Sequence, residues 1–165
     1  MDIASNPGSM LKQSFEMLQI PGDAVQDDFL NNNLESDGFD FVVSIGCFHH
    51  TGSISSCLNE TYRILKPGGI AIVMLYNQYS LAQWFRWPLT TFRTLFQVPT
   101  QATPAQRKAY DASSDGSAAP VTKFSSAKRV QELFSQFSHI RVRKENCDDI
   151  RLRRTTLIPR ERFLS

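Results

Sequence analysis

Hydrophobic and polar residues follow one another along this chain in patterns that predict a helix, a strand, a second helix and a second strand. Residues 8–19 place most of their apolar side chains at helical spacing and end before Pro21-Gly22, which is typical of an amphipathic helix. Phe39–Gly46 is a compact run rich in β-branched residues, the pattern of a strand buried on both faces in a parallel sheet. Residues 53–65 carry one apolar stripe and predict a helix, and Ile70–Tyr76 predicts a second buried strand.

Strand, helix and strand in this order form a βαβ unit. Lys66-Pro67-Gly68-Gly69 separates the helix from the second strand, and we assign it a structural role as a stop and turn. Because parallel strands need a crossover of this kind, we predict an α/β fold with a mostly parallel sheet.

The composition and the hydrophobic pattern of the sequence change after Tyr76. Residues 79–96 are rich in aromatic side chains and predict a helix that is kinked or restarted at Pro88. Residues 97–123 predict a long loop, because they are rich in Ala, Ser, Thr, Gln and Pro. Further predictions are a short strand at residues 23–27, a helix at residues 126–137 capped by Ser125, and an edge strand at residues 139–144.

Composition bears on whether the protein binds nucleic acid or zinc, is secreted or spans a membrane. The chain has 18 Lys and Arg against 16 Asp and Glu, a balance that argues neither for nor against a nucleic-acid partner. We read the basic residues near the C-terminus as a solvated face, so nucleic acid is not an expected partner. The cysteines are odd in number and fit no zinc spacing, which favours a reducing, cytoplasmic setting. There is no signal-peptide pattern, and no apolar run approaches the roughly 18 residues that span a bilayer.

Three segments of the first half occur in a characteristic order and spacing. Asp28 lies eleven residues before Phe39, FDFVVSIGCFHHT occupies residues 39–51, and RILKPGGIAIVMLYN occupies residues 63–77. Together they resemble the acid after the third strand, the fourth strand with its loop, and the turn into the fifth strand of the small type 11 domain family of class I S-adenosylmethionine-dependent methyltransferases. The resemblance covers residues 1–77 and continues weakly through the segment that begins at Tyr110.

The resemblance implies a Rossmann-like sheet with helices on both faces and S-adenosylmethionine as the cofactor. MDIASNPGSMLKQSFEML is similar to the end of the family's second strand and the following helix, so Asp2 matches the acid that binds the ribose hydroxyls. Asp28 matches the position that receives the adenine amino group or orients its loop. Asp27 is the competing choice, and this Asn-rich segment also suits an ordinary turn.

Ser44, Gly46 and Cys47 end the first predicted strand and are candidate cofactor-binding residues. Ligands of open α/β sheets bind beyond the carboxyl ends of strands, where small residues permit close approach, although small residues equally suit tight packing of a strand against its loop. His49 and His50 are candidates for assisting a proton transfer, against a structural role in the pocket wall. No metal site is expected, because adjacent side chains diverge in most backbone conformations.

Tyr76, Asn77 and Trp84 are the candidate residues on the substrate side. Tyr76 and Asn77 follow the second predicted strand, where they either border a substrate pocket or cap the strand end. Trp84 belongs to an aromatic segment that also contains Arg86 and Arg93. This segment suits three interpretations: a lid over a pocket, a helix packed on the core, or a peripheral membrane contact.

The family's first strand and glycine-rich loop should precede Asp2, and we therefore expect the sequence to be truncated at its N-terminus. Residues 1–77 would form a partial cofactor-binding core, and residues 78–165 would form the lid and substrate side of the same domain. The expected function is methyl transfer from S-adenosylmethionine to a small-molecule or lipid-like acceptor. The alternative is an inactive fragment or pseudoenzyme that acts as a binding module. A nicotinamide-dependent oxidoreductase is disfavoured, since both a dinucleotide fingerprint and a hydride-transfer pair are missing from the sequence.

Overall fold

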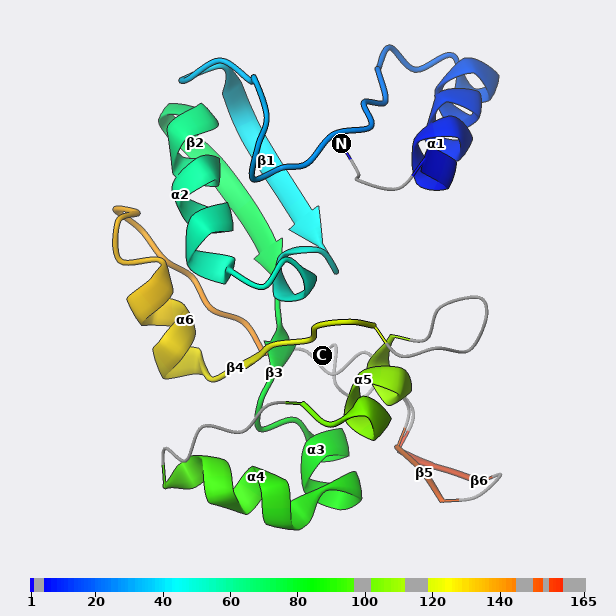
Figure 1. The fold of residues 1–165 in the computed structure, drawn as a ribbon, viewed down its shortest axis with the longest axis vertical. Helices are drawn as coiled ribbons and strands as arrows, with labels where there is room; N and C mark the ends of the chain where they lie inside the picture. Colours follow the sequence, from blue (N-terminus) through cyan, green and yellow to red (C-terminus); the bar gives the residue numbers. More distant parts are fainter. Residues whose placement is uncertain (2–4, 97–101, 112–118, 145–149, 153–154, 159–165) are drawn as a thin grey trace. The chain divides into compact units, whose positions relative to one another are not determined.

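A computed structural model of the chain describes residues 1, 5–96, 102–111, 119–144, 150–152 and 155–158 (Figure 1). The chain divides into two compact units, Met1–Met74 and Leu75–Ser165. The first unit contains the predicted βαβ element, and the second contains shorter helices and strands.

The βαβ element consists of β1 (Phe39–Ile45), α2 (Ile54–Ile64) and β2 (Leu65–Met74). β1 and β2 pair in parallel, so the predicted α/β class with parallel strands is confirmed for this pair. Gly68 and its neighbours interrupt the pairing at the start of β2, where Gly68 adopts a φ of 83°. The predicted turn therefore lies inside the first residues of the strand.

Helix α2 begins at a serine cap and buries one side. The Ser53 hydroxyl accepts a hydrogen bond from the Ser56 backbone N–H, which satisfies one of the unpaired donors at the helix start. The buried side chains of α2 recur at three- and four-residue spacing: Ile54, Cys57, Leu58, Thr61 and Ile64. Together with Phe48 and Leu65 they make the core of this unit, and α2 lies along β2 on one side of the strand pair (Figure 1).

The opposite face of the strand pair is apolar and exposed. Phe41, Val43 and Ile45 alternate along β1 on this face, and Ile70 and Ile72 of β2 lie beside them. The prediction that β1 is buried on both faces is therefore wrong within the described residues, and the helices expected on both faces are seen on one. The physical reason is that a β-branched run favours a strand, whereas its burial needs a second layer that the local sequence does not specify.

Helix α1 (Ser5–Leu18) confirms the helix expected at residues 8–19. It ends where Gln19 adopts a φ of 53° and Phe15 packs on the backbone of Gly22. A side chain at position 22 would come within 2.8 Å of the Phe15 ring. The strand predicted at residues 23–27 is not formed, because only Gln26 makes an isolated bridge there.

The second unit begins with a short parallel pair, β3 (Tyr76–Asn77) and β4 (Phe124–Ser125). Helices α3 (Leu81–Arg86) and α4 (Pro88–Leu95) confirm the predicted helical segment with a restart at Pro88. None of the helices that the structure describes has the length and apolar character needed to cross a membrane.

Three predictions for this unit need correction. The loop expected at residues 97–123 contains a helix, α5 (Pro104–Tyr110), which starts with a capping box between Thr103 and Gln106. The N-cap of α6 (Ala127–Leu133) is Ser126 and not the predicted Ser125, because Ser125 belongs to strand β4. Residues 139–144 do not form the predicted edge strand, since they pair with no other strand among the described residues. A further antiparallel pair joins β5 (Ile150–Leu152) to β6 (Thr155–Ile158).

Candidate functional site

The carboxyl end of β1 carries the three small residues that the sequence singled out. Ser44 is buried, and its hydroxyl oxygen has no hydrogen-bond partner among the described residues. Gly46 adopts a φ of 76°, a left-handed conformation that favours glycine, and Cys47 is exposed. This edge therefore combines an open backbone with a buried polar atom that can still accept or donate a hydrogen bond.

Aromatic packing brings the loop that precedes β1 to the same edge. Phe29 stacks on Phe48, with ring centroids 5.3 Å apart and an angle of 25° between the ring planes. Because Phe29 follows Asp28 and Phe48 follows Cys47, the stack anchors both candidate residues near one another. The exposed Asp28 carboxylate accepts a hydrogen bond of 2.9 Å from the Leu30 backbone N–H.

The Cys57 thiol of α2 contacts the loop that follows β1. Burial raises the pKa of Cys57, and its 3.1 Å hydrogen bond with the Thr51 hydroxyl lowers it again in part. The charges of Cys47 and Asp28 raise the pKa of Cys57 further. Cys57 is thus a neutral, buried thiol and a poor nucleophile at neutral pH.

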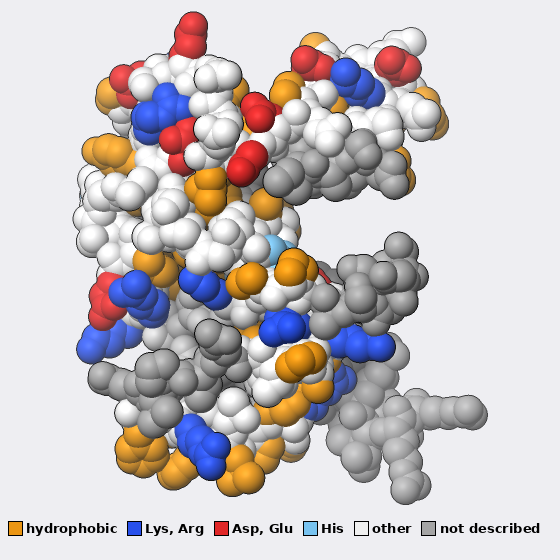
Figure 2. Space-filling view, viewed as in Figure 1, with side chains coloured by type: hydrophobic (Ala, Val, Ile, Leu, Met, Phe, Trp, Pro, Cys, Tyr) orange, Lys and Arg blue, Asp and Glu red, His pale blue; other side chains and the backbone are white. Residues whose placement is uncertain are grey.

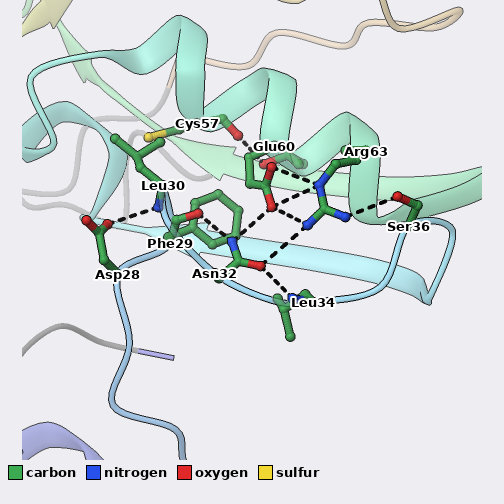
Figure 3. Close-up of polar contacts among 10 residues, drawn as sticks. Asp28, Phe29, Leu30, Asn32, Leu34, Ser36, Cys57, Glu60 and Arg63 are labelled. Atoms are coloured by element: carbon green, nitrogen blue, oxygen red, sulfur yellow. Dashed lines mark hydrogen bonds and ion pairs between the residues drawn. The ribbon is translucent and has the colours of Figure 1, made fainter.

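A polar network fixes the loop before β1 onto α2 (Figure 3). Asn32 donates to the Phe29 carbonyl at 2.6 Å and to the Glu60 carboxylate at 2.9 Å. Arg63 forms an ion pair with Glu60 and donates to the Ser36 hydroxyl at 3.1 Å. The hydrogen bonds from Arg63 and Asn32 lower the pKa of Glu60, although burial opposes them. The network connects the segment that follows Asp28 to α2.

His49 and His50 lie in the short 3-10 helix Phe48–His50 that follows β1. His49 is fully buried and His50 is half-buried, with ring centroids 4.2 Å apart. The burial of His49 suits a residue of the structural wall. A role of either histidine in proton transfer stays a prediction.

Asp2, the candidate for ribose binding, lies outside the described residues. Asp27 accepts a hydrogen bond from the backbone N–H of Asp28 at 2.9 Å, so its carboxylate is engaged in shaping the turn. Of the two acids weighed for the adenine side, Asp28 is the more exposed.

In the second unit, Tyr76 lies in an aromatic cluster. Its hydroxyl donates to Asp111 at 2.9 Å, and its ring centroid lies 4.9 Å from that of Tyr110 and 6.1 Å from that of Phe124. The sequence patterns missed Tyr110, Asp111 and Phe124 as neighbours of Tyr76, because local periodicity carries no signal of contacts between residues so far apart in the chain. The adjacent Tyr110 and Asp111 begin the weakly matching segment, which was the one available signal.

The other two candidates of the substrate side are placed differently. The Asn77 side chain accepts a hydrogen bond from the Tyr79 backbone N–H at 3.0 Å and so shapes the turn after β3. Trp84 is exposed on α3, and it is Trp87 whose ring centroid lies 6.4 Å from that of Tyr110. A substrate-binding role for Tyr76, Asn77 and Trp84 stays a prediction.

Comparison with known proteins finds a similarity in the first unit. A methyltransferase domain family matches residues 1–73, which is nearly the whole of the unit that ends at Met74. No curated protein sequence matches the chain.

Several solved structures resemble the chain, and two of them are S-adenosylmethionine-dependent methyltransferases. An S-adenosylmethionine-dependent methyltransferase from Methanosarcina mazei is 16% identical, with a TM-score of 0.51, over 82% of this chain and 65% of that one. A possible histamine N-methyltransferase from Thermotoga maritima is 19% identical, with a TM-score of 0.46, over 76% of this chain and 50% of that one. The chain thus spans between half and two-thirds of the length of these structures. Residues 1–73 of this chain are thus similar to a methyltransferase domain.

Proposed function

We propose that the protein transfers a methyl group from S-adenosylmethionine to a small-molecule or lipid-like acceptor. The observation that carries this proposal is the family match over residues 1–73, which coincides with the unit that presents Ser44, Gly46 and Asp28 at one edge. The sulfonium cofactor supplies an activated methyl group, and the protein's task is to hold donor and acceptor close and aligned.

The residues present at the carboxyl end of β1 fit such a cofactor. The left-handed Gly46 leaves room beside its backbone, since the nearest atom to a β-carbon at this position would be the terminal carbon of Met74 at 3.8 Å. The Ser44 hydroxyl, which has no partner within the described part of the chain, offers a hydrogen bond in a buried setting, where such a bond contributes most. Asp28 offers a carboxylate at the same edge, which suits an amino or hydroxyl donor.

The nature of the acceptor is inferred from the second unit. Tyr76, Tyr110 and Phe124 form a half-buried aromatic cluster with one carboxylate, Asp111, attached to it. Aromatic side chains of this kind favour an apolar or amphipathic acceptor over a nucleic acid or a polyanion. We propose a reducing, cytoplasmic setting for the reaction, which suits the reduced cysteines Cys47 and Cys57.

Titration of S-adenosylmethionine by calorimetry tests the cofactor edge. Asp28→Asn keeps an oxygen that can accept from the Leu30 N–H but removes the charge, and we expect an affinity about ten-fold lower or more. Ser44→Ala removes a buried hydroxyl without a partner, so the fold should keep its stability while the affinity falls. Asp40→Asn is the matched control, because Asp40 lies at the other end of β1 and pairs with Lys66 at 2.9 Å.

The outcomes separate the two functions considered. Binding by the wild-type chain that is unchanged in Asp28→Asn and Ser44→Ala would remove the assignment of this edge. Failure of the wild-type, folded chain to bind S-adenosylmethionine would favour the inactive binding module instead.

A further inference from the structure

The hairpin of α3 and α4, residues 81–96, distributes its side chains in an unusual way. Its most buried side chains are polar: Gln83 is 3% exposed and Thr91 is 2% exposed. The Thr91 hydroxyl donates to the Gln83 carbonyl at 3.1 Å, and the Gln83 side chain accepts from Gln106 of α5 at 3.2 Å. Polar contacts therefore close the inner side of the hairpin.

The outer side of the same hairpin is apolar. Phe85 and Leu89 are 76% and 77% exposed. The other exposed large apolar side chains here are Leu81, Trp84, Phe92, Leu95 and Phe96. Figure 2 shows hydrophobic side chains gathered over α3 and α4 with basic side chains among them. Exposed apolar patches rimmed by polar side chains commonly mark interaction sites.

The charges on this surface have one sign. Arg86 and Arg93 are exposed among the apolar side chains. The sequence contains no aspartate or glutamate from Leu75 to Tyr110. An occupant of this surface should accordingly be apolar in part and negatively charged.

We propose that the α3–α4 hairpin is a peripheral binding surface for an anionic lipid bilayer. The Phe, Leu and Trp side chains would enter the boundary between headgroups and acyl chains, and the two arginines would pair with lipid phosphates. The helices have 6 and 8 residues, which suits a segment that lies on the surface. This proposal does not rest on methyl transfer.

A second copy of the chain fits this surface less well. A symmetric dimer built on the hairpin would bring the same patch of both copies together, so Arg86 and Arg93 of both copies would lie in one interface. The hairpin offers no carboxylate to neutralise them. An anionic membrane supplies the missing charge.

Tryptophan fluorescence provides a direct test on the full chain. The protein has two tryptophans, Trp84 and Trp87, and both lie in the hairpin. Vesicles of phosphatidylcholine mixed with phosphatidylglycerol should shift the emission to shorter wavelength, and brominated lipids should quench it. Phosphatidylcholine vesicles alone should have little effect. Binding should weaken in high salt, because the Debye length falls from about 10 Å at 0.1 M to about 3 Å at 1 M.

Two double variants separate the charged and apolar contributions. Arg86→Gln with Arg93→Gln should lower vesicle partitioning by about five-fold for each arginine. Leu89→Ser with Phe92→Ser should abolish the spectral shift. The controls are Lys128→Gln, an exposed cation on α6, and Phe41→Ser, an exposed aromatic residue on β1, and both should bind as the wild type does. Circular dichroism checks that each variant folds.

Several results would overturn the proposal. They are the absence of any vesicle effect, equal binding to neutral and anionic vesicles, and equal binding by folded double variants. An emission shift that needs no lipid and grows with protein concentration would identify a second copy as the occupant.

Discussion

At the scale of single residues, the candidate cofactor edge depends on Gly46 and on Ser44, whose hydroxyl has no hydrogen-bond partner among the residues that the structure describes. Gly46 follows β1 with a φ of 76°, so the backbone turns away from the strand in a conformation that costs other residues free energy. Ser44 lies two positions earlier, on the buried face of β1. The residue types were visible in the sequence, whereas the positive φ and the missing partner of the hydroxyl were not.

Gly46→Ala should destabilise the protein by about 1–2 kcal/mol, because alanine pays the steric cost of the left-handed conformation. Neighbouring atoms add little, since the nearest one is 3.8 Å from the added carbon. Urea denaturation measures the change. Gly8→Ala is the control, because Gly8 lies in helix α1 and a β-carbon added there would have no neighbouring atom within 4 Å. Alanine at this position should stabilise the protein by about 0.5–1 kcal/mol. Equal effects at both positions would argue against backbone strain at Gly46.

At the scale of elements, the loop before β1 owes its position to α2. Asn32 is hydrogen-bonded both within the loop and to Glu60, and Arg63 bridges Glu60 to Ser36. The network thereby couples the placement of Asp28 to the stability of the helix. No sequence pattern predicted it, because its members are about 30 residues apart and each alone is an ordinary surface residue.

Glu60→Gln should lower the free energy of unfolding by about 1–3 kcal/mol at neutral pH, the range for hydrogen bonds to a charged group. The pKa of Glu60 is lowered from its ordinary 4.5. The contribution of Glu60 is therefore present above pH 4.5 and is lost as the pH falls through the lowered folded-state value. Unfolding curves from pH 7 to pH 3 should show the wild type and the variant converging in acid.

The control for this experiment is Glu132→Gln. Glu132 also pairs with an arginine three residues away, at 3.1 Å from Arg129, but both side chains are at least half exposed. An exposed pair of this kind contributes little, so stability should hardly change. Parallel pH profiles for wild type and Glu60→Gln would show that the pairing with Arg63 does not stabilise the fold.

The elements themselves were predicted with unequal success. The parallel pair and α2 were recognised because their apolar periods are clear over seven or more residues. Helix α5 was missed because its Ala- and Gln-rich composition resembles a loop, although Thr103 with Gln106 is a recognisable capping pattern. The strand expected at residues 139–144 failed, since alternation indicates a strand only if another strand is there to pair with it.

At the scale of the whole molecule, the uncovered face of β1 and β2 is the largest departure from expectation. Its apolar side chains should bind the dye anilinonaphthalene sulfonate, whose fluorescence rises on exposed apolar surface. Phe41→Ser with Ile72→Ser should lower this fluorescence while the fold persists. Val42→Ser is the contrast, because Val42 lies on the face toward α2, and its change should lower the melting temperature and raise dye binding. If the dye fluorescence is the same in the double variant as in the wild type, the exposed apolar surface that binds the dye lies elsewhere.

The sequence by itself determined the βαβ order, the parallel pairing, the helix restart at Pro88 and the resemblance to methyltransferases. These follow from local periodicity, turn residues and motif spacing, which act over a few residues at a time. Only the tertiary structure decided that Phe29 stacks on Phe48, that Tyr76 contacts Tyr110 and Asp111, and that apolar side chains of β1, α3 and α4 face outward. Such facts depend on which distant segments pack together, and packing energy is not encoded in any single stretch of the chain.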